Sequence, residues 1–401
     1  MDPVRYLEAL VGIESVFPGE AGLAHFLSKE LERCGFDVRM QPFGDGRYNV
    51  LAERSASAEH ETRDSGPAAG NPKPGTGNAK PLLLYGHMDT VPAYGYGQGR
   101  NPLKLEERDG RMHGLGAYDM KAGIAAIMQT VDAVRDGRAL KIMFVSDEEA
   151  ESRGCYEAVK SGFVDGVSMA LAAEISDVHD MSERTRTITL GRRGRVQYQI
   201  DVPGKSFHAA RAEEGISALT QAARIAIELE SMEMPAHQKL SRGSQFVRSF
   251  SSSSESLSLP DKAALLVDRH LVFPESAESA RAEMQDAIDR LYDSGELREA
   301  DGRRAMVSIR PREVPYLMPF VTPEEEPEVQ RLASAIRDAL GPDVEPRYNY
   351  GMSVADENLL AMQGVPTASF GPIGGGEHSS GEWVSKRSYL ELIEVLKRLI
   401  A

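Results

Sequence analysis

Short runs of apolar residues recur along the chain and have the length of buried strands. Four of them occupy residues 82–85, 142–145, 169–173 and 366–370, and their continuous hydrophobicity is typical of parallel strands covered on both faces. A helix is expected over residues 20–35, and another where Ile124, Ile127, Met128, Val131 and Val134 recur at helical spacing. Strands that alternate with helices predict an α/β fold with helices on the faces of a sheet.

The pattern changes between about residues 191 and 312. Val196, Tyr198, Ile200 and Val202 alternate with polar residues, as in a strand with one buried face. A helix, two strands, a second helix and a further strand follow, which is the β-α-β-β-α-β order of the split ferredoxin-like arrangement. We therefore predict a main domain formed by residues 1–190 and 313–401, with an α+β domain inserted at residues 191–312. Residues 54–80, rich in Ser, Ala, Gly and Pro, predict a mobile surface insertion.

Length, charge and cysteine content narrow the possible classes of protein. A chain of 401 residues is long for a single core, which agrees with two domains. Its 46 basic and 61 acidic residues give a formal charge of −15, which disfavours nucleic acid and anionic membranes as partners. With only two cysteines, Cys34 and Cys155, neither a disulfide framework nor a cysteine-rich zinc cluster is expected. The first residues lack the pattern of a secretory signal and no apolar run could span a bilayer, so we expect a cytoplasmic protein.

Residue types that bind metals follow the four predicted strands in turn. They are His87 and Asp89, then Glu148 and Glu149, then Glu174, and finally His378. Ligands of open α/β sheets bind beyond the carboxyl ends of the strands, so we expect these side chains to meet in one crevice. Asp119, just before a predicted helix, can project into the same place. Histidines and carboxylates without cysteine suit zinc, manganese or cobalt, and two such ions that share a carboxylate can activate a water for hydrolysis.

Six segments, in this order, resemble one known family. They are GHMDTVP (86–92), GAYDMKAGIAA (116–126), SDEEAESRG (146–154), the acid at Glu174, GKSFHAARAEEG (204–215) and GGGEHSSGEWV (374–384). Together they resemble the co-catalytic zinc hydrolases that include acetylornithine deacetylase, succinyl-diaminopimelate desuccinylase, aminoacylases and glutamate carboxypeptidases. The resemblance implies a metal-dependent exopeptidase-like catalytic domain, an inserted lid or dimerisation domain, and a homodimer.

The resemblance also implies a role for each matched residue. Asp119 would bridge two divalent ions, with His87 and Glu174 on one ion and Glu149 and His378 on the other. The remaining roles concern Glu148, Asp89 and His208. Glu148 would be the general base, Asp89 would orient the ligand histidine, and His208 would stabilise the developing oxyanion in the partner subunit's site. The implied function is a dinuclear metallohydrolase, with zinc, cobalt or manganese, that cleaves an amide bond of a small N-acyl amino acid or short peptide.

Some features leave the substrate and the mechanism open. The strand segment VDRHLVFP (267–274) departs from the family pattern, although Arg269 could bind a substrate carboxylate and Asp356 could line the substrate pocket. A deacylase and an exopeptidase both fit the motifs. Ser379 and Ser380 beside His378 would suit a metal-independent serine hydrolase, but the strand-elbow-helix context of such serines is not evident. A non-catalytic scaffold is the remaining alternative.

Overall fold

The computed structural model describes residues 2–57, 80–97, 100–254 and 256–401. Most of the surface insertion expected at residues 54–80 therefore lies outside the described residues. The chain divides into two compact units, which are described separately. Unit 1 comprises Met1–Gly191, Val321–Gly351 and Ala355–Ala401, and unit 2 comprises Arg192–Phe320 and Met352–Val354. The prediction had placed the inserted domain at residues 191–312.

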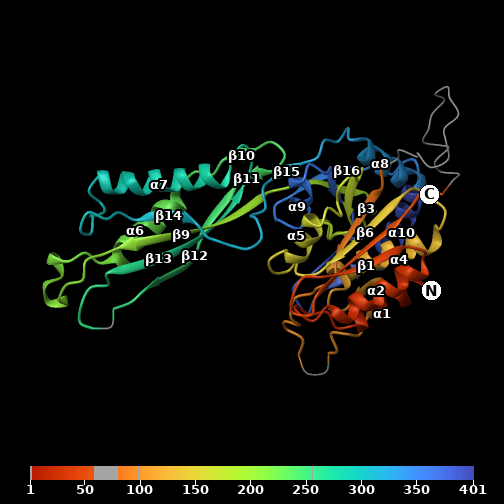
Figure 1. The fold of residues 1–401 in the computed structure, drawn as a ribbon, viewed down its shortest axis with the longest axis horizontal. Coiled ribbons are helices and arrows are strands. Elements are labelled where there is room, and N and C mark those ends of the chain that lie inside the picture. Colours follow the sequence, from red (N-terminus) through yellow and green to blue (C-terminus); the bar gives the residue numbers. More distant parts are fainter. Residues whose placement is uncertain (1, 58–79, 98–99, 255) are drawn as a thin grey trace. The chain divides into compact units, whose positions relative to one another are not determined.

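A mixed sheet forms the centre of unit 1 (Figure 1), and within the described residues it has nine strands. Its order is β1-β2-β6-β3-β7-β17-β8-β15, with β16 paired to β8. These strands are β1 (Asp37–Pro42), β2 (Tyr48–Arg54), β3 (Leu82–His87), β6 (Leu140–Val145), β7 (Met169–Ala172), β8 (Thr187–Arg192), β15 (Phe320–Val321), β16 (Arg347–Gly351) and β17 (Thr367–Ser369). The four strands predicted from apolar runs are the neighbours β6, β3, β7 and β17, and each adjoining pair is parallel.

Helices cover the sheet of unit 1. They are α1 (Pro3–Gly12), α2 (Ala21–Arg33), α4 (Ala122–Ala133), α5 (Arg153–Lys160), α8 (Pro327–Leu340), α9 (Glu357–Met362) and α10 (Lys386–Ile400). Every residue of β3 is buried, because alternate side chains enter different layers. Leu82 and Leu84 belong to the core cluster that includes α4 and α10, whereas Tyr85 bonds to Asp356 beside α9. Burial on both sides explains the unbroken hydrophobicity of the strand sequences.

A second, smaller sheet of unit 1 has the order β18-β19-β5-β4. Its strands are β4 (Glu106–Arg108), β5 (Arg111–His113), β18 (Gly374–Gly375) and β19 (Trp383–Ser385). The position of His378 differs from the predicted one. His378 does not directly follow the parallel strand β17 but lies in the loop between β18 and β19, because the chain makes an extra short strand first.

Unit 2 has the predicted order of elements: β9 (Gly194–Pro203), α6 (Ala218–Ser231), β12 (Ser244–Ser252), β13 (Lys262–Leu271), α7 (Ala277–Asp293) and β14 (Met306–Ile309). The antiparallel sheet order β12-β13-β9-β14 is that of a ferredoxin-like fold. The short elements β10 (Ala236–His237), β11 (Ser241–Arg242) and η2 (Ala209–Glu214) complete the unit. Tyr198, Ile200 and Val202 pack in one core with Ile225 of α6 and Met284 of α7, which explains their alternation.

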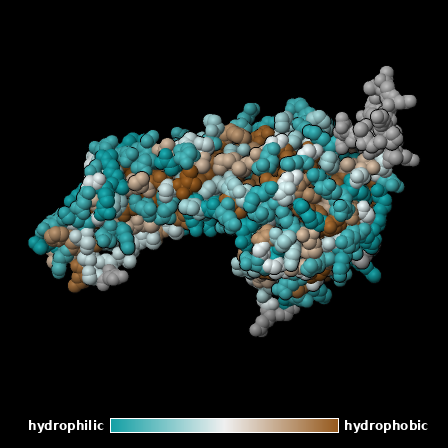
Figure 2. All heavy atoms as spheres, in the orientation of Figure 1, coloured by the Kyte–Doolittle hydropathy of each residue, from teal (hydrophilic) through white to brown (hydrophobic). Residues whose placement is uncertain are grey.

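The surface is predominantly hydrophilic in the view of Figure 2, as expected for a chain in which 27% of the residues are charged. Among the described residues, no helix is both long enough and apolar enough to cross a bilayer.

Candidate metal centre

Three neighbouring strands of unit 1 bring predicted ligands to one edge of the sheet. β6, β3 and β7 are parallel, so their carboxyl ends lie together. His87 is the last residue of β3, Glu149 lies in the loop after β6, and Glu174 follows β7 by two residues. Asp119 lies in the short helical turn η1 (Ala117–Lys121), which precedes α4. Residues far apart in the sequence thus lie at one edge of the sheet.

Two groups of potential ligand atoms occur within this region. In the first, His87 Nε2 lies 3.0 Å from Asp119 Oδ1 and 3.5 Å from Glu174 Oε2. In the second, His378 Nε2 lies 3.4 Å from Asp119 Oδ2 and 3.0 Å from Glu149 Oε2. The ligand atoms of each group all lie within 4.8 Å of one another.

Asp119 belongs to both groups, and its two carboxylate oxygens are divided between them. Oδ1 faces His87, whereas Oδ2 faces His378. Such a carboxylate can bridge two cations that are about 3.5–4 Å apart. His87, Asp119 and Glu174 are buried, whereas the side chain of His378 is 51% exposed. The first group is therefore buried in the interior, and the second is open to solvent on the side of His378.

The electrostatics of the cluster indicate an excess of negative charge. Burial alone would lower the pKa of His87, but the charge of Glu174 and the hydrogen bond to Asp119 outweigh it and raise that pKa. The bonds of His378 to Asp119 and Glu149 raise its pKa to about 11. Burial raises the pKa of both Glu148 and Glu149. Carboxylates in this number, with only imidazoles to balance them, fit the binding of cations.

The donor set also fits particular metals. Imidazole nitrogens with carboxylate oxygens suit zinc and related transition metals, whereas calcium and magnesium prefer oxygen ligands throughout. Each group has three protein ligands, which is the number that zinc keeps in hydrolytic sites that leave a position open. The residues present therefore fit two ions held by His87, Asp119, Glu149, Glu174 and His378.

Asp89 contacts both the first histidine and the loop of the second group. Its backbone carbonyl lies 3.0 Å from His87 Nδ1, and its Oδ1 lies 3.6 Å from the same nitrogen. Its Oδ2 accepts a hydrogen bond from the backbone N–H of Glu149 at 3.0 Å. A partner on Nδ1 leaves Nε2 of His87 as the nitrogen for a metal. The nearer partner of Nδ1 is the backbone carbonyl of Asp89, so orientation of His87 by the Asp89 carboxylate stays a prediction.

A left-handed turn presents Glu148 and Glu149. Asp147 has φ 81°, and its carbonyl accepts from the backbone N–H groups of Glu151 and Ser152 at 3.2 and 2.7 Å. Its side chain bonds to the buried Arg47 at 2.5 Å. Neither Asp147 nor Arg47 stands out in the sequence as a functional residue. The SDEE motif contains Asp147, but only the fold reveals that Arg47, one hundred positions earlier, holds this turn.

Comparison with known proteins identifies the family. Residues 83–401 match the model of peptidase family M20/M25/M40. The chain belongs to this family. The resemblance inferred from the motifs is thereby confirmed.

Named relatives and solved structures agree with this family. The chain is 28% identical over 327 residues to succinyl-diaminopimelate desuccinylase of Sulfurimonas denitrificans, which covers 80% of this chain and 83% of that protein. It is 26% identical over 254 residues to the Rickettsia felis desuccinylase, and the match spans 61% of this chain and only 60% of that relative's length.

Two solved structures show the same fold. A tripeptidase from Staphylococcus aureus matches with a TM-score of 0.77 at 18% identity, over 99% of this chain and 96% of that one. The aminopeptidase PepT from Bacillus cereus matches with a TM-score of 0.77 at 19% identity, over 99% and 97%.

The other predicted site residues are Asp356, Arg269 and His208, and none of them belongs to either group of ligands. Asp356 is fully buried in unit 1, where its Oδ2 accepts from the Tyr85 hydroxyl at 2.7 Å and burial raises its pKa to about 7. Arg269 is fully buried in unit 2 and bonds to Glu275 and Glu283, each at 2.5 Å. These contacts are internal to each unit, so a role of Asp356 or Arg269 in substrate binding stays a prediction without support from its surroundings.

His208 is exposed on unit 2, directly before η2. Its Nδ1 accepts a hydrogen bond from the backbone N–H of Ala210 at 3.1 Å. A neutral imidazole with an accepting Nδ1 has its proton on Nε2. The side chain can therefore donate a hydrogen bond to another molecule.

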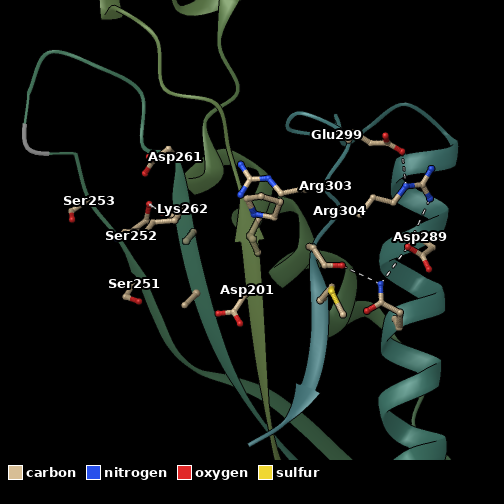
Figure 3. Close-up of a pocket in the computed structure, with 18 of the residues that line it drawn as sticks. Asp201, Ser251, Ser252, Ser253, Asp261, Lys262, Asp289, Glu299, Arg303 and Arg304 are labelled. Atoms are coloured by element: carbon tan, nitrogen blue, oxygen red, sulfur yellow. Dashed lines mark hydrogen bonds and ion pairs between the residues drawn. The ribbon is translucent and has the colours of Figure 1, made fainter.

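An open groove of about 980 Å³ lies at one end of the unit 2 sheet (Figure 3). Charged side chains of both signs line it, and some of them pair with one another. Arg304, for example, bonds to Glu299 at 2.8 Å and lies 3.8 Å from Asp289. None of the predicted metal ligands lines the groove, so it is separate from the candidate metal centre.

Proposed function

We propose that this chain is a dinuclear metal-dependent hydrolase that cleaves an amide bond of a small N-acyl amino acid or short peptide. The observation that carries the proposal is the Asp119 carboxylate, whose two oxygens face His87 and His378 in two overlapping groups of ligands. Two divalent ions, zinc or else cobalt or manganese, would be held by His87, Asp119, Glu149, Glu174 and His378.

Glu148 would transfer protons, and Asp89 would position the metal ligands. Bound ions of this kind polarise a carbonyl and make water a nucleophile at neutral pH. Glu148 adjoins the ligand Glu149 without belonging to either group, which suits a general base that takes a proton from the attacking water and passes it to the leaving amine. Asp89 would keep His87 oriented and fix the backbone of Glu149.

The names of the relatives support two substrate classes. The sequence relatives are desuccinylases, which favours removal of an acyl group from an amino acid. The solved structures of the same fold include a tripeptidase and an aminopeptidase, so release of a terminal residue is the alternative. A screen of N-succinyl and N-acetyl amino acids against dipeptides and tripeptides, with zinc-loaded protein, distinguishes the two.

The test of the mechanism is Glu148→Gln, with Glu151→Gln in the same loop as the matched control. Loss of the general base should reduce kcat by at least about 100-fold, while elemental analysis still finds the metal. Glu151 is exposed, and its variant should keep wild-type kcat. Near-normal turnover by Glu148→Gln would reject its role. Full activity of the wild type after treatment with a strong zinc chelator would reject the metallohydrolase and favour a serine hydrolase.

We further propose that the protein is a cytoplasmic homodimer that pairs through unit 2. Support comes from β12, an edge strand of the unit 2 sheet that carries the exposed aromatic residues Phe246 and Phe250. An edge strand with apolar side chains favours pairing with another strand. His208 on the same unit would then donate to the oxyanion that forms in the partner's site.

Subunit mixing tests the shared site. Chains with Glu148→Gln and chains with His208→Ala should each be inactive, and mixed dimers should regain part of the activity, because one of their sites then has both residues intact. Exchange of subunits is verified with differently tagged chains. Verified exchange without any recovery would refute a contribution of His208 from the partner.

A further inference from the structure

Glu382 is a buried carboxylate that no step of the proposed reaction uses. Its exposed fraction is 2%, and it lies at the end of the loop that carries His378, directly before β19. Burial of a carboxylate costs free energy unless hydrogen bonds satisfy its oxygens. The partners of Glu382 therefore indicate why a charged group occupies this position.

Three backbone N–H groups at the Asp119 turn donate to this carboxylate. Those of Tyr118 and Asp119 bond to Oε1 at 2.8 and 3.0 Å, and that of Gly116 bonds to Oε2 at 2.9 Å. A regular helix could not satisfy them here, because Gly116 has the left-handed φ of 69° and Asp119 has φ −109° and ψ 94°. Glu382 thus holds the backbone of the residue whose side chain joins the two ligand groups.

Glu382 is also fixed from the side of the His378 loop. Its backbone N–H donates to the carbonyl of Ser379 at 3.2 Å, and its own carbonyl lies 3.0 Å from His113 Nδ1. The next residue, Trp383, pairs with His113 across β19 and β5. A single side chain therefore connects the loop that carries His378 to the turn that carries Asp119.

We propose that Glu382 is a positioning residue that sets the separation between the Asp119 carboxylate and the His378 imidazole. Through this separation it determines the affinity for the ion held by Asp119, Glu149 and His378. The inference rests on the proposed function, because it presupposes that this group of ligands binds an ion. Metal–ligand distances vary by only about 0.2 Å in well-formed sites, so a small shift of the Asp119 turn weakens binding. Glu382 itself touches neither ion nor substrate and acts through Asp119.

Calorimetric titration of the metal-free protein with Zn²⁺ tests the inference. The wild type should bind two ions per chain. Glu382→Gln keeps the shape of the side chain but replaces one acceptor oxygen with a donating NH₂ group. This group would face a backbone N–H, which is also a donor. The affinity for one of the two ions should fall about 10–100-fold, as is typical when a hydrogen-bond partner of a metal ligand is lost, and the other should change less.

A second variant and a control separate positioning from general stability. Glu382→Asp retains the charge, but its shorter side chain cannot reach all three N–H groups. It should therefore lower the affinity for the same ion. Glu391→Gln is the matched control, because Glu391 accepts from the Thr185 N–H at 2.9 Å and from Arg184 Nε at 2.6 Å, outside both ligand groups. It should retain both Zn²⁺ affinities.

Each outcome decides the question. If both Glu382 variants keep both Zn²⁺ affinities within about threefold, well below the expected loss of about 10–100-fold, the inference is wrong and the proposed function stands. An equal loss in Glu391→Gln would also overturn it, because the effect would then be general destabilisation. If Glu382→Gln fails to fold, Glu382→Asp decides. Failure of the wild type to bind two ions would instead refute the proposed function.

Discussion

Arg47 allows a quantitative test of how unit 1 holds the loop that carries Glu148 and Glu149. Its guanidinium is fully buried and bonds to Glu20 and to Asp147, each at 2.5 Å. It also lies over the ring of Phe17 at 4.5 Å and that of Phe43 at 5.2 Å. Arg47→Met preserves much of the apolar volume but removes the charge, so two buried carboxylates lose their shared partner.

The expected cost follows from the burial of all three groups. Removing one partner of a buried ion pair destabilises a protein by about 3–5 kcal/mol, because an uncompensated charge remains in the interior. Even the lower figure reduces the equilibrium constant for folding by more than about 100-fold. Arg33→Met is the matched control, since Arg33 also contacts two carboxylates, of Glu30 and Asp132, but its side chain is 52% exposed. Exposed pairs of this kind contribute about 0.2–1 kcal/mol.

Urea unfolding of the metal-free variants, followed by tryptophan fluorescence, measures the difference. The single tryptophan, Trp383, lies in unit 1, so the signal reports the unit that contains Arg47. Adding Glu20→Gln to Arg47→Met should recover part of the lost stability, because a neutral amide is less costly to bury than a lone carboxylate. A loss in Arg47→Met no larger than in Arg33→Met would refute the reasoning.

Two further predictions concern stability and the backbone near the site. Burial favours the neutral form of Glu328, but hydrogen bonds from Arg138 outweigh it and hold the pKa of Glu328 below its ordinary value. This pair therefore stabilises the protein at pH values above the unfolded pKa of about 4.3. Its contribution is lost as the pH falls through the lower pKa of the folded state. The free energy of unfolding of Glu328→Gln should therefore decrease less steeply on acidification than that of the wild type. An unchanged decline would contradict this. At Gly371, an added Cβ would lie 1.7 Å from the carbonyl oxygen of Glu174, so Gly371→Ala should cost about 1–3 kcal/mol or more and weaken metal binding. Gly12→Ala, whose Cβ would meet an ordinary contact at 3.8 Å, should leave metal binding intact in the same titration.

Local patterns in the sequence determined the elements and the family. The continuous apolar runs predicted β3, β6, β7 and β17, because strands covered on both faces need apolar side chains at every position. Alternation predicted β9 and with it the ferredoxin-like order of unit 2, because a strand with one buried face needs apolar residues only at every second position. The six motif segments led to the family, which the match over residues 83–401 confirmed.

Only the tertiary structure decided how the carboxylates are shared and supported. The family resemblance implied that Asp119 is shared, but which of its oxygens faces His87 and which faces His378 depends on two loops meeting in space. The same holds for Arg47 and Glu382, which look like ordinary surface charges in the sequence but are buried because distant groups satisfy them. Periodicity records which face of an element is covered, whereas the partner of a buried charge is set by the packing of segments far apart in the chain.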